Sequence, residues 1–280
     1  MGMEWVMVMT NSIITLVIVT HNNFTEKNGC IEDVIYSISV QKKVQTEIIV
    51  VDNRSSYYDC KCLKEIQKKY NNFILVFNDD NCISKGRNIG AKLSNGDNII
   101  FLDDDIIFLT NQELFKMSFH FSKRIYGYSA NRFWTIPNWY ENNKNRVKKY
   151  IKENSLSNVP TIRKNISVNR KCDDRYLLRT FIGNLGYINR QILEDSIIWD
   201  ESYSGYGYED NDYAFRLLLN YGDFEVLSDI SVLHIWHNIK ESNVFEQEKN
   251  YSLFQSKLKE SGYKVFHIGR ALYAEGNILE

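Results

Sequence analysis

The sequence is poor in proline and has no long uninterrupted apolar run. Its two prolines among 280 residues, Pro137 and Pro160, both lie in the stretch 119–178, which shows no clear helical or strand period. The apolar segment 5–19 is interrupted by polar residues at 10–12, so it is too short and too polar to span a bilayer. It also lacks the basic start and the cleavage site of a signal peptide. We therefore expect a cytoplasmic protein without a transmembrane segment, with peripheral membrane contact left open.

An excess of charge of one sign is also absent. The sequence has 34 Lys and Arg against 35 Asp and Glu, which gives a net charge of -1. This balance argues against a general attraction to nucleic acid or anionic lipid. With 44% hydrophobic and 14% aromatic residues, the chain has the composition of an ordinary globular protein. We therefore expect no nucleic-acid partner.

The five cysteines show no metal-binding pattern. Cys60 and Cys62 lie one residue apart, which matches no common zinc motif, and no second Cys/His pair completes a site. Their number is odd, so they cannot all pair within one chain. Free thiols in a reducing compartment explain them best.

The first hundred residues alternate apolar runs with amphipathic segments. This alternation is typical of an α/β fold with a mostly parallel central sheet flanked by helices, because each crossover helix returns the chain to the next strand. Right-handed crossovers bring the carboxyl ends of the strands to one edge, where ligands bind. Strands are expected at 13–20, 47–52, 73–77 and 99–102, and helices at 31–40, 59–70 and 84–93.

The most informative segment is NIIFLDDD, residues 98–105, which runs from apolar residues into three carboxylates. Asp103, Asp104 and Asp105 would repel one another unless a cation or hydrogen-bond donors compensate them. Alternate residues of an extended chain point the same way, so Asp103 and Asp105 can share one face. Carboxylates in this place suit a hard divalent cation that also holds phosphate. An acidic turn without a ligand is the alternative.

Two further clusters lie earlier in the first half of the chain. Asp52 ends the second expected strand, where a carboxylate can bind a ribose or a base, or simply close an Asx turn. The segment SKGRNIG, residues 84–90, opens a helix with two glycines, Lys85 and Arg87. It is neither a Walker loop nor a dinucleotide fingerprint, so phosphate binding rests only on its charge and its close backbone approach.

Two more clusters lie in the second half of the chain. GYGYEDND, residues 205–212, places glycines and tyrosines before three acids at the start of a helix. Those acids can cap the helix, or one can accept a proton from a sugar hydroxyl beside an aromatic side chain. His234 and His237 in HIWH are candidate metal ligands, although either histidine can have a structural role.

Taken in order, these pieces resemble the inverting family 2 glycosyltransferases of the GT-A fold, which is Rossmann-like. The second half is similar to the galactosyltransferase-like segment of chondroitin polymerase, polypeptide GalNAc-transferases and β-1,4-galactosyltransferases. The resemblance covers most of the chain except the middle stretch. The matching pieces are IITLVIVTHNN (13–23), EIIVVDNRS (47–55), SKGRNIGAKLSNGDNIIFLDDD (84–105), FIGNLGYINRQIL (181–193) and WDESYSGYGYEDNDYAFRL (199–217).

The resemblance implies a donor site for a UDP-sugar. Thr20 and Asp52 would lie near the uridine, and Arg87 near the base or the diphosphate. Asp103 would contact the ribose side, and Asp104 is grouped with these nucleotide-sugar residues without a role of its own. Many relatives carry a second Asp where this chain has Asn53, which weakens any inference about the base.

The resemblance also implies the metal and the catalytic residues. Asp105 would bind Mn²⁺ or Mg²⁺, with His237 or, less in keeping with the pattern, His234 as a further ligand. Asp210 would be the general base and Glu209 would help to bind the acceptor. Tyr206 and its neighbour Gly207 would form the acceptor side of the site.

The expected function is transfer of a sugar from a UDP-sugar to a glycan, a lipid-linked acceptor or a peptide. A nucleotidyltransferase on a similar sheet is an alternative, but THNNFTEKNG after the first strand lacks the glycine-rich phosphate loop of that class. A non-catalytic sugar-binding or partner subunit is the other alternative. The implied division is a nucleotide-sugar half (1–118), a variable insertion (119–178), an acceptor and catalytic half (179–245) and a helical tail (246–280).

Overall fold

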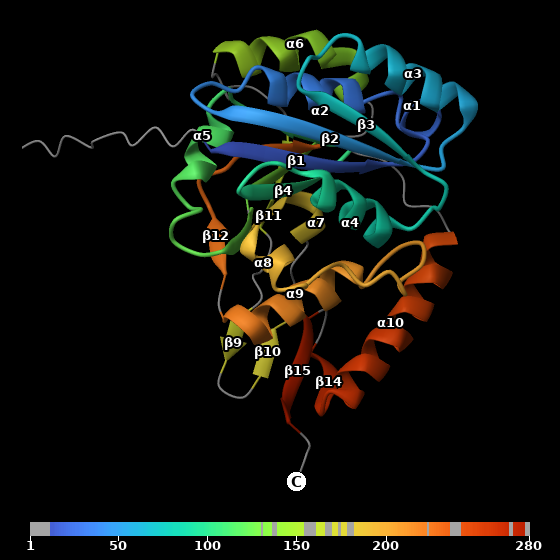
Figure 1. The fold of residues 1–280 in the computed structure, drawn as a ribbon, viewed down its shortest axis with the longest axis vertical. Helices are drawn as coiled ribbons and strands as arrows, with labels where there is room; N and C mark the ends of the chain where they lie inside the picture. Colours follow the sequence, from blue (N-terminus) through green and yellow to red (C-terminus); the bar gives the residue numbers. More distant parts are fainter. Residues whose placement is uncertain are drawn as a thin grey trace, which may run out of the picture.

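The fold is built on a mixed seven-stranded sheet (Figure 1). The first four strands along this part of the chain pair in parallel, with β1 in contact with both β2 and β4, and β2 with β3. They are β1 (Ile13–Thr20), β2 (Gln45–Asn53), β3 (Phe73–Asn78) and β4 (Asn98–Asp103). The computed structural model describes residues 12–129, 131–135, 139–153, 161–165, 170–172, 175–177, 182–222, 224–235, 242–268 and 271–277. The predicted mostly parallel sheet is confirmed.

The remaining strands of this sheet come from later in the chain. β11 (Gly186–Asn189) pairs antiparallel with both β4 and β6 (Tyr126–Ser129), and β12 (Glu225–Leu227) pairs parallel with β6. The strand order is therefore β12-β6-β11-β4-β1-β2-β3. The stretch 119–178, expected as an insertion, thus contributes a strand to the central sheet. The short runs around β6 and β11 have no period long enough to reveal this pairing from sequence.

Helices cover both faces of the sheet, because its inner strands are apolar on both sides. Leu16 and Ile18 of β1 pack with helices α2 and α3, whereas Val17 faces the opposite cluster around Phe101 and Trp199. Burial of each such side chain stabilises the fold by about 1.5–3 kcal/mol. One face carries α1 (Asn23–Glu26), α2 (Ile31–Ser39), α3 (Tyr57–Gln67) and α6 (Trp139–Glu153), and the other α4 (Ile83–Leu93), α7 (Ile182–Leu185), α8 (Gln191–Glu194) and α9 (Glu209–Tyr221) (Figure 1).

Two smaller four-stranded sheets complete the fold. One has the order β5-β13-β7-β8, formed by β5 (Ile106–Phe108), β13 (Val232–His234), β7 (Asn131–Thr135) and β8 (Thr161–Asn165). The other has the order β14-β15-β10-β9, formed by β14 (Tyr263–Ile268), β15 (Ala271–Asn277), β10 (Arg175–Leu177) and β9 (Arg170–Cys172). The short helix α5 (Glu113–Ser118) lies between β5 and β6 in the chain.

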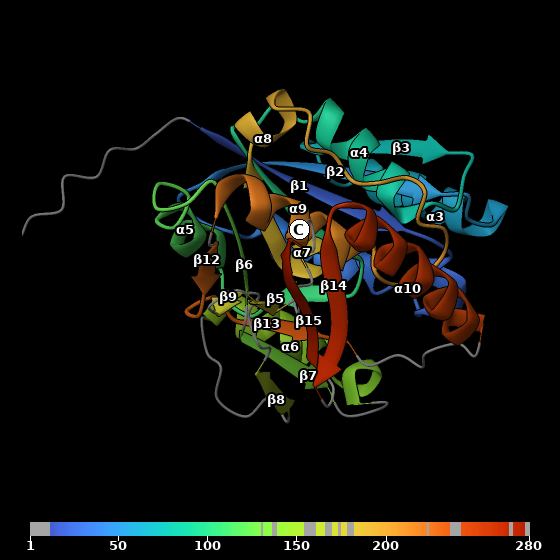
Figure 2. The same cartoon turned by 90° about the horizontal axis from the view of Figure 1, so that it is seen from below.

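The stretch 246–280, expected as a helical tail, is only partly helical. Helix α10 (Ser242–Glu260) ends before Gly262, whose φ of 82° cannot continue a helix. The chain then forms the antiparallel pair β14 and β15, which lies beside α10 in the view from below (Figure 2). The helical part of the expectation holds as far as Glu260.

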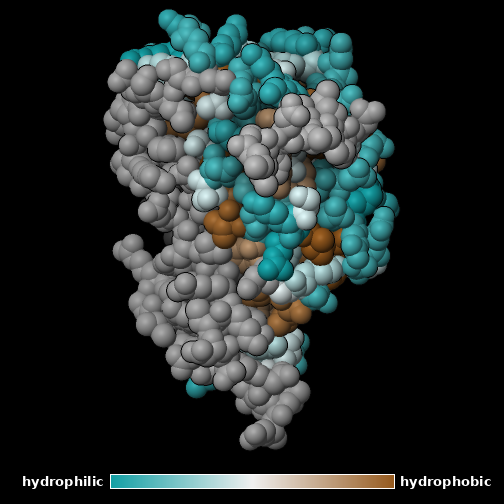
Figure 3. Space-filling view, turned by 90° about the vertical axis from the view of Figure 1, so that its left-hand side faces the viewer, coloured by the Kyte–Doolittle hydropathy of each residue, from teal (hydrophilic) through white to brown (hydrophobic). Residues whose placement is uncertain are grey.

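The described surface shown in Figure 3 is mainly hydrophilic, with hydrophobic side chains in small separate groups. This distribution agrees with the placement of the large apolar side chains between the sheet and its helices. Among the described residues, no helix is long and apolar enough to cross a membrane.

Gly90 tests the packing of α4 on the sheet. A Cβ at this position would lie 2.3 Å from Cγ1 of Val17, so Gly90→Ala forces β1 and α4 apart. We expect the free energy of unfolding to fall by about 1–3 kcal/mol, which exceeds the roughly 1 kcal/mol that alanine gains in helix propensity. Urea unfolding measures the change, and Lys92→Ala on the exposed side of α4 is the control. A more stable Gly90→Ala variant would contradict the close approach.

Candidate functional site

The candidate site lies where the parallel strands end. Thr20 at the end of β1 is in register with Asp52 of β2, and its neighbour Val19 is in register with Asp103 of β4. The apolar part of each strand ends at the same level of the sheet, so the polar groups that follow lie together at one edge. The expectation that these residues meet at a common edge is met.

Asp104 is buried and has three side-chain partners. Its Oδ2 accepts hydrogen bonds from Thr20 Oγ1 at 2.7 Å and from Asn23 Nδ2 at 2.8 Å. Its Oδ1 lies 2.7 Å from Nζ of Lys27. The middle carboxylate therefore ties the turn after β4 to the segment after β1. This structural role was not foreseen from the sequence.

Asp105 lies between a lysine and a histidine. Its Oδ2 is 2.9 Å from Lys27 Nζ, and its Oδ1 is 3.3 Å from Nε2 of His234. The backbone enforces this meeting, because Ile235 N donates to the carbonyl of Asp105 at 3.0 Å and β13 pairs with β5. His234 follows two buried residues of β13 and is itself buried.

Asp105 and His234 fit two ligand positions of one divalent cation. Two ligands bound to one ion at about 2.1 Å lie roughly 3 Å apart when the bonds are near perpendicular, and 3.3 Å separates these two atoms. No group of three or more His, Cys, Asp or Glu side chains that could hold a metal occurs within the described residues. His237, the other predicted ligand, lies outside the part of the chain that the structure describes.

Arg87 links the donor side of the edge to the second half of the chain. Its Nη1 lies 3.2 Å from Glu209 Oε1 and 3.3 Å from Asp210 Oδ1, and its Nη2 lies 3.6 Å from Asp103 Oδ1. The guanidinium also stacks over the ring of Trp199, 4.3 Å from its centroid. Arg87 is only 3% exposed. It neutralises two buried acids of α9 and the partly exposed side chain of Asp103.

Asp210 lies in the first turn of α9, and its Oδ1 accepts a hydrogen bond from Gly183 N at 2.9 Å. Burial raises the pKa of Asp210, Arg87 opposes that effect, and Glu209 and Asp103 raise it further, to about 7. A carboxyl that titrates near neutral pH is suited to accept a proton from a hydroxyl group. The sequence had identified Asp210 and Glu209 but not their common contact with Arg87.

Gly183 and Asn184 of α7 complete this contact. A Cβ at Gly183 would lie 2.1 Å from the Arg87 guanidinium carbon, so only glycine leaves room for Arg87 there. Asn184 Nδ2 donates to Asp103 Oδ2. Sequence reasoning matched the segment FIGNLG to the family without giving either residue a role, and it also missed Trp199 and Lys27. A glycine beside a polar amide at the start of a short helix was the available signal.

Asp52 is buried, and its two carboxylate oxygens have different surroundings. Its Oδ2 accepts hydrogen bonds from Ser55 N at 3.2 Å and from Cys60 Sγ at 3.5 Å, as in a turn. Its Oδ1 has no hydrogen-bond partner among the described residues. Burial raises the pKa of the Cys60 thiol to about 11, and Asp52 adds to this effect. The thiol therefore remains protonated and can donate to Asp52.

The loop that contains Tyr206 and Gly207, predicted to lie on the acceptor side, is held by α10. Tyr206 N donates to Glu246 Oε2 at 3.0 Å, and Asn250 Nδ2 donates to the carbonyl of Tyr206 at 3.2 Å. Gly207 has a φ of 97°, which side chains rarely tolerate. Because the backbone of Tyr206 is fixed while 47% of the residue is exposed, its ring is available to a ligand.

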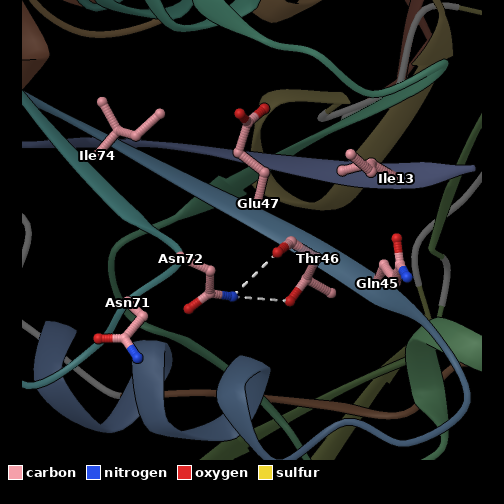
Figure 4. A pocket seen from close by; sticks show the side chains of 7 residues that line it. All are labelled: Ile13, Gln45, Thr46, Glu47, Asn71, Asn72 and Ile74. Carbon is pink, nitrogen blue, oxygen red and sulfur yellow. Dashed lines mark hydrogen bonds between the residues drawn. The ribbon is translucent and has the colours of Figure 1, made fainter.

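A shallow depression of about 500 Å³ lies elsewhere on the sheet (Figure 4). It is lined by the first residues of β1 and β2 together with Asn71, Asn72 and Ile74 at the start of β3. Asn72 Nδ2 donates there to Thr46. These are the amino ends of the strands, so the depression lies at the edge opposite the predicted site residues.

The sheet and the carboxylates at its edge define an α/β protein of the GT-A type. A model of glycosyl transferase family 2 matches residues 15–196. The chain belongs to this family. The matched range includes Asp103–Asp105 and ends before Glu209 and Asp210.

Solved structures of glycosyltransferases share the fold. A mannosyltransferase from Pyrobaculum calidifontis, solved with GDP-Man and Mn²⁺, has a TM-score of 0.58 at 13% identity over 88% of this chain and 64% of its own. TarS 1–349 from S. aureus, in complex with UDP, has a TM-score of 0.54 at 15% identity over 88% and 65%. GalNAc-T7 with UDP, GalNAc and Mn²⁺ has a TM-score of 0.58 at 17% identity over 88% and 48%.

The chain thus spans less than two thirds of the length of these three structures. Comparison with curated proteins gave no match.

Replacement of Arg87 tests its role in holding the site together. Arg87→Met leaves two buried acids and the partly exposed Asp103 without their cation, and we expect a loss of about 3–5 kcal/mol of stability at pH 8. The loss should be smaller at pH 5.5, because protonation then removes part of the repulsion. Chemical denaturation at both pH values measures it. Lys85→Met, a substitution on the same helix as Arg87 that removes an exposed ion pair with Asp80, should change stability by less than about 1 kcal/mol. Equal effects of the two substitutions would contradict the proposed role of Arg87.

Proposed function

We propose that the chain is a metal-dependent, inverting glycosyltransferase that moves a sugar from a UDP-sugar to a glycan, lipid-linked or peptide acceptor. The observation that carries this proposal is the contact of Arg87 with both Asp103 and Asp210. One guanidinium holds the carboxylate at the end of the donor-side strand next to the carboxylate that opens α9. A base beside a nucleotide-binding edge is what transfer to a hydroxyl requires.

The donor site would be formed by the strand ends. Thr20 and Asp52 would lie near the uridine, and Asp103 near the ribose. Arg87 and Asp104 are buried and already paired, so they would act on the donor site by holding its other residues in place. Structures of similar fold were solved with UDP, with UDP and GalNAc, or with GDP-Man. These complexes support a nucleotide-sugar donor, and the residues after β2 would decide which base is bound.

The divalent cation, Mn²⁺ or Mg²⁺, would be held by Asp105 and His234, with His237 as the other predicted ligand. Two of the structures of similar fold were solved with Mn²⁺. When bound, the ion would neutralise the diphosphate that leaves with the nucleotide. Asp105 is kept in place for this role by its backbone contact with Ile235.

The chemistry assigned to the chain is a single displacement. Asp210 would take the proton of the acceptor hydroxyl, the oxygen would form a bond to the anomeric carbon, and the bond from that carbon to the diphosphate would break. The electron pair of that bond leaves with UDP. Glu209 would bind the acceptor, and Tyr206 with Gly207 would form its platform. Attack from the face opposite the leaving group inverts the anomeric carbon.

The similarity of the second half to polypeptide GalNAc-transferases, β-1,4-galactosyltransferases and chondroitin polymerase stays a prediction, as does a cytoplasmic location. A non-catalytic partner subunit is the rival proposal, and a nucleotidyltransferase is another. The position of Asp210, a buried acid held by Arg87 next to Asp103 at the strand ends, supports the transferase.

Release of UDP tests the proposed reaction. With Mn²⁺ and a panel of UDP-sugars, we expect the wild-type protein to release UDP from at least one donor. Asp210→Asn should lower kcat by roughly 10²–10⁴-fold, the usual effect of losing a general base, while the Kd for UDP stays nearly unchanged. Coupled-enzyme detection of UDP and calorimetric titration with UDP provide the two measurements.

The exposed Asp195→Asn serves as the control and should keep both parameters. Loss of UDP binding in Asp210→Asn would place Asp210 in the donor site instead. Absence of both UDP release and UDP binding in the wild-type protein would rule out the proposed transfer from a UDP-sugar.

The pH profile tests the base. Because Asp210 accepts a proton only when ionised and its pKa is about 7, kcat/KM should rise with pH through about 7. The charge of Glu209 raises this pKa, so Glu209→Gln should move the rising limb to lower pH. Glu248→Gln, exposed on α10, should leave the limb in place. A flat wild-type profile between pH 6 and 8 would argue against Asp210 as the base.

A further inference from the structure

The side chain of Lys27 contacts two of the three consecutive acids. Its Nζ is 2.7 Å from Asp104 Oδ1 and 2.9 Å from Asp105 Oδ2. The side chains of the two acids are 6% and 3% exposed, whereas that of Lys27 is 24% exposed. The lysine therefore approaches from the solvent side and closes over a buried acidic pair.

The electrostatics of this contact favour a charged lysine. Nζ of Lys27 lies 2.7 Å from one carboxylate and 2.9 Å from the other, and two negative charges this close favour the charged form of a lysine. Lys27 thus carries a full positive charge at any physiological pH. It supplies to Asp105 part of the charge compensation that the sequence predicted from a cation or from hydrogen-bond donors.

The backbone around Lys27 suits a movable contact. Lys27 follows the four-residue helix α1, outside any strand, and the next two residues, Asn28 and Gly29, both have positive φ. A lysine ammonium is a point charge on a flexible stem, without the fixed fork that ties an arginine to one geometry. It can leave one carboxylate and keep the other. Arg87, enclosed by four partners at the same edge, cannot.

A divalent cation at Asp105 and the ammonium at 2.9 Å from the same carboxylate would repel each other strongly. At separations near 4 Å, a double and a single positive charge repel by several kcal/mol even at the effective dielectric of a protein surface. His234 Nε2 lies 3.3 Å from the other oxygen of Asp105, so the lysine and the histidine approach this carboxylate at different oxygens.

We propose that Lys27 is a resident cation that neutralises Asp105 in the metal-free protein and leaves it, while keeping Asp104, when a divalent cation binds to Asp105 and His234. This inference rests on the metal site of the proposed function. Lys27 thereby lowers the affinity for the metal and keeps the empty site from unfolding through repulsion among its acids. Lys27 is a positioning residue in this scheme and does not touch the sugar.

Mn²⁺ binding to the purified protein, measured by electron paramagnetic resonance of the free ion, tests the exchange. Lys27→Gln should bind Mn²⁺ at least roughly tenfold more tightly than the wild type, since a competing charge is gone. Its melting temperature without metal should fall, and Mn²⁺ should raise it more than it raises that of the wild type. Lys69→Gln, which removes an exposed pair with Glu32, is the matched control and should leave the Mn²⁺ affinity unchanged.

Unchanged or weaker Mn²⁺ binding by Lys27→Gln, or no Mn²⁺ binding by either protein, would overturn the proposal. If Lys27→Gln does not fold, the wild type still gives an answer. The ¹⁵N resonance of the Lys27 ammonium should show slow solvent exchange without metal and faster exchange when Mg²⁺ saturates the site. A resonance that Mg²⁺ saturation leaves unchanged would equally overturn the proposal.

UDP release measured on the same preparations separates this inference from the proposed function. If the wild type turns over a UDP-sugar but the wild type and Lys27→Gln bind Mn²⁺ with equal affinity, only the proposed exchange is contradicted. Tighter Mn²⁺ binding by Lys27→Gln without UDP release by the wild type supports the exchange and defeats the transferase.

Discussion

The candidate site depends on one buried guanidinium. Arg87 lies within 3.6 Å of carboxylates from β4 and α9 and over the ring of Trp199. These partners come from distant parts of the chain, and without a shared cation their like charges would drive them apart. Gly183 is required at this place because any side chain would occupy the space of the guanidinium. The edge formed by the strand ends and helix α9 are therefore joined electrostatically as well as by packing.

Each of the three consecutive acids has its negative charge compensated by a different set of neighbours. Asp103 is compensated by Arg87 and an amide, Asp104 by hydroxyl and amide donors with Lys27, and Asp105 by Lys27 beside His234. In the proposed exchange, a divalent cation replaces Lys27 at Asp105 while Lys27 keeps Asp104. The same sequence motif thus combines a fixed structural carboxylate with one that can serve a metal.

Much of the fold could be predicted because the relevant forces act locally. The first four strands and the helices between them follow from runs of apolar residues whose lengths match single elements, and the structure reproduces them within a few residues. The pairing of β6 with β11 and β12 could not be predicted in this way. These strands have four, four and three residues, which is too short to show a period. β11 pairs with the edge of β4, β6 with β11, and β12 with β6, so tertiary structure sets each partner. β14 and β15, with six and seven residues, were also missed in the expected helical tail, because their pairing with each other and with β10 is a tertiary contact.

For the site, sequence alone determined the residue types: acids at a strand end, acids at a helix start, and histidines near the end of a late strand. Their identity as groups that could bind a nucleotide-sugar or accept a proton follows from chemistry that each residue carries wherever it lies. Tertiary structure decided the neighbours, namely Arg87 beside Asp210, Lys27 on Asp105, and Thr20 on Asp104. Charge compensation acts over a few ångströms in space, regardless of distance along the chain, so no reading of spacing alone could have paired them.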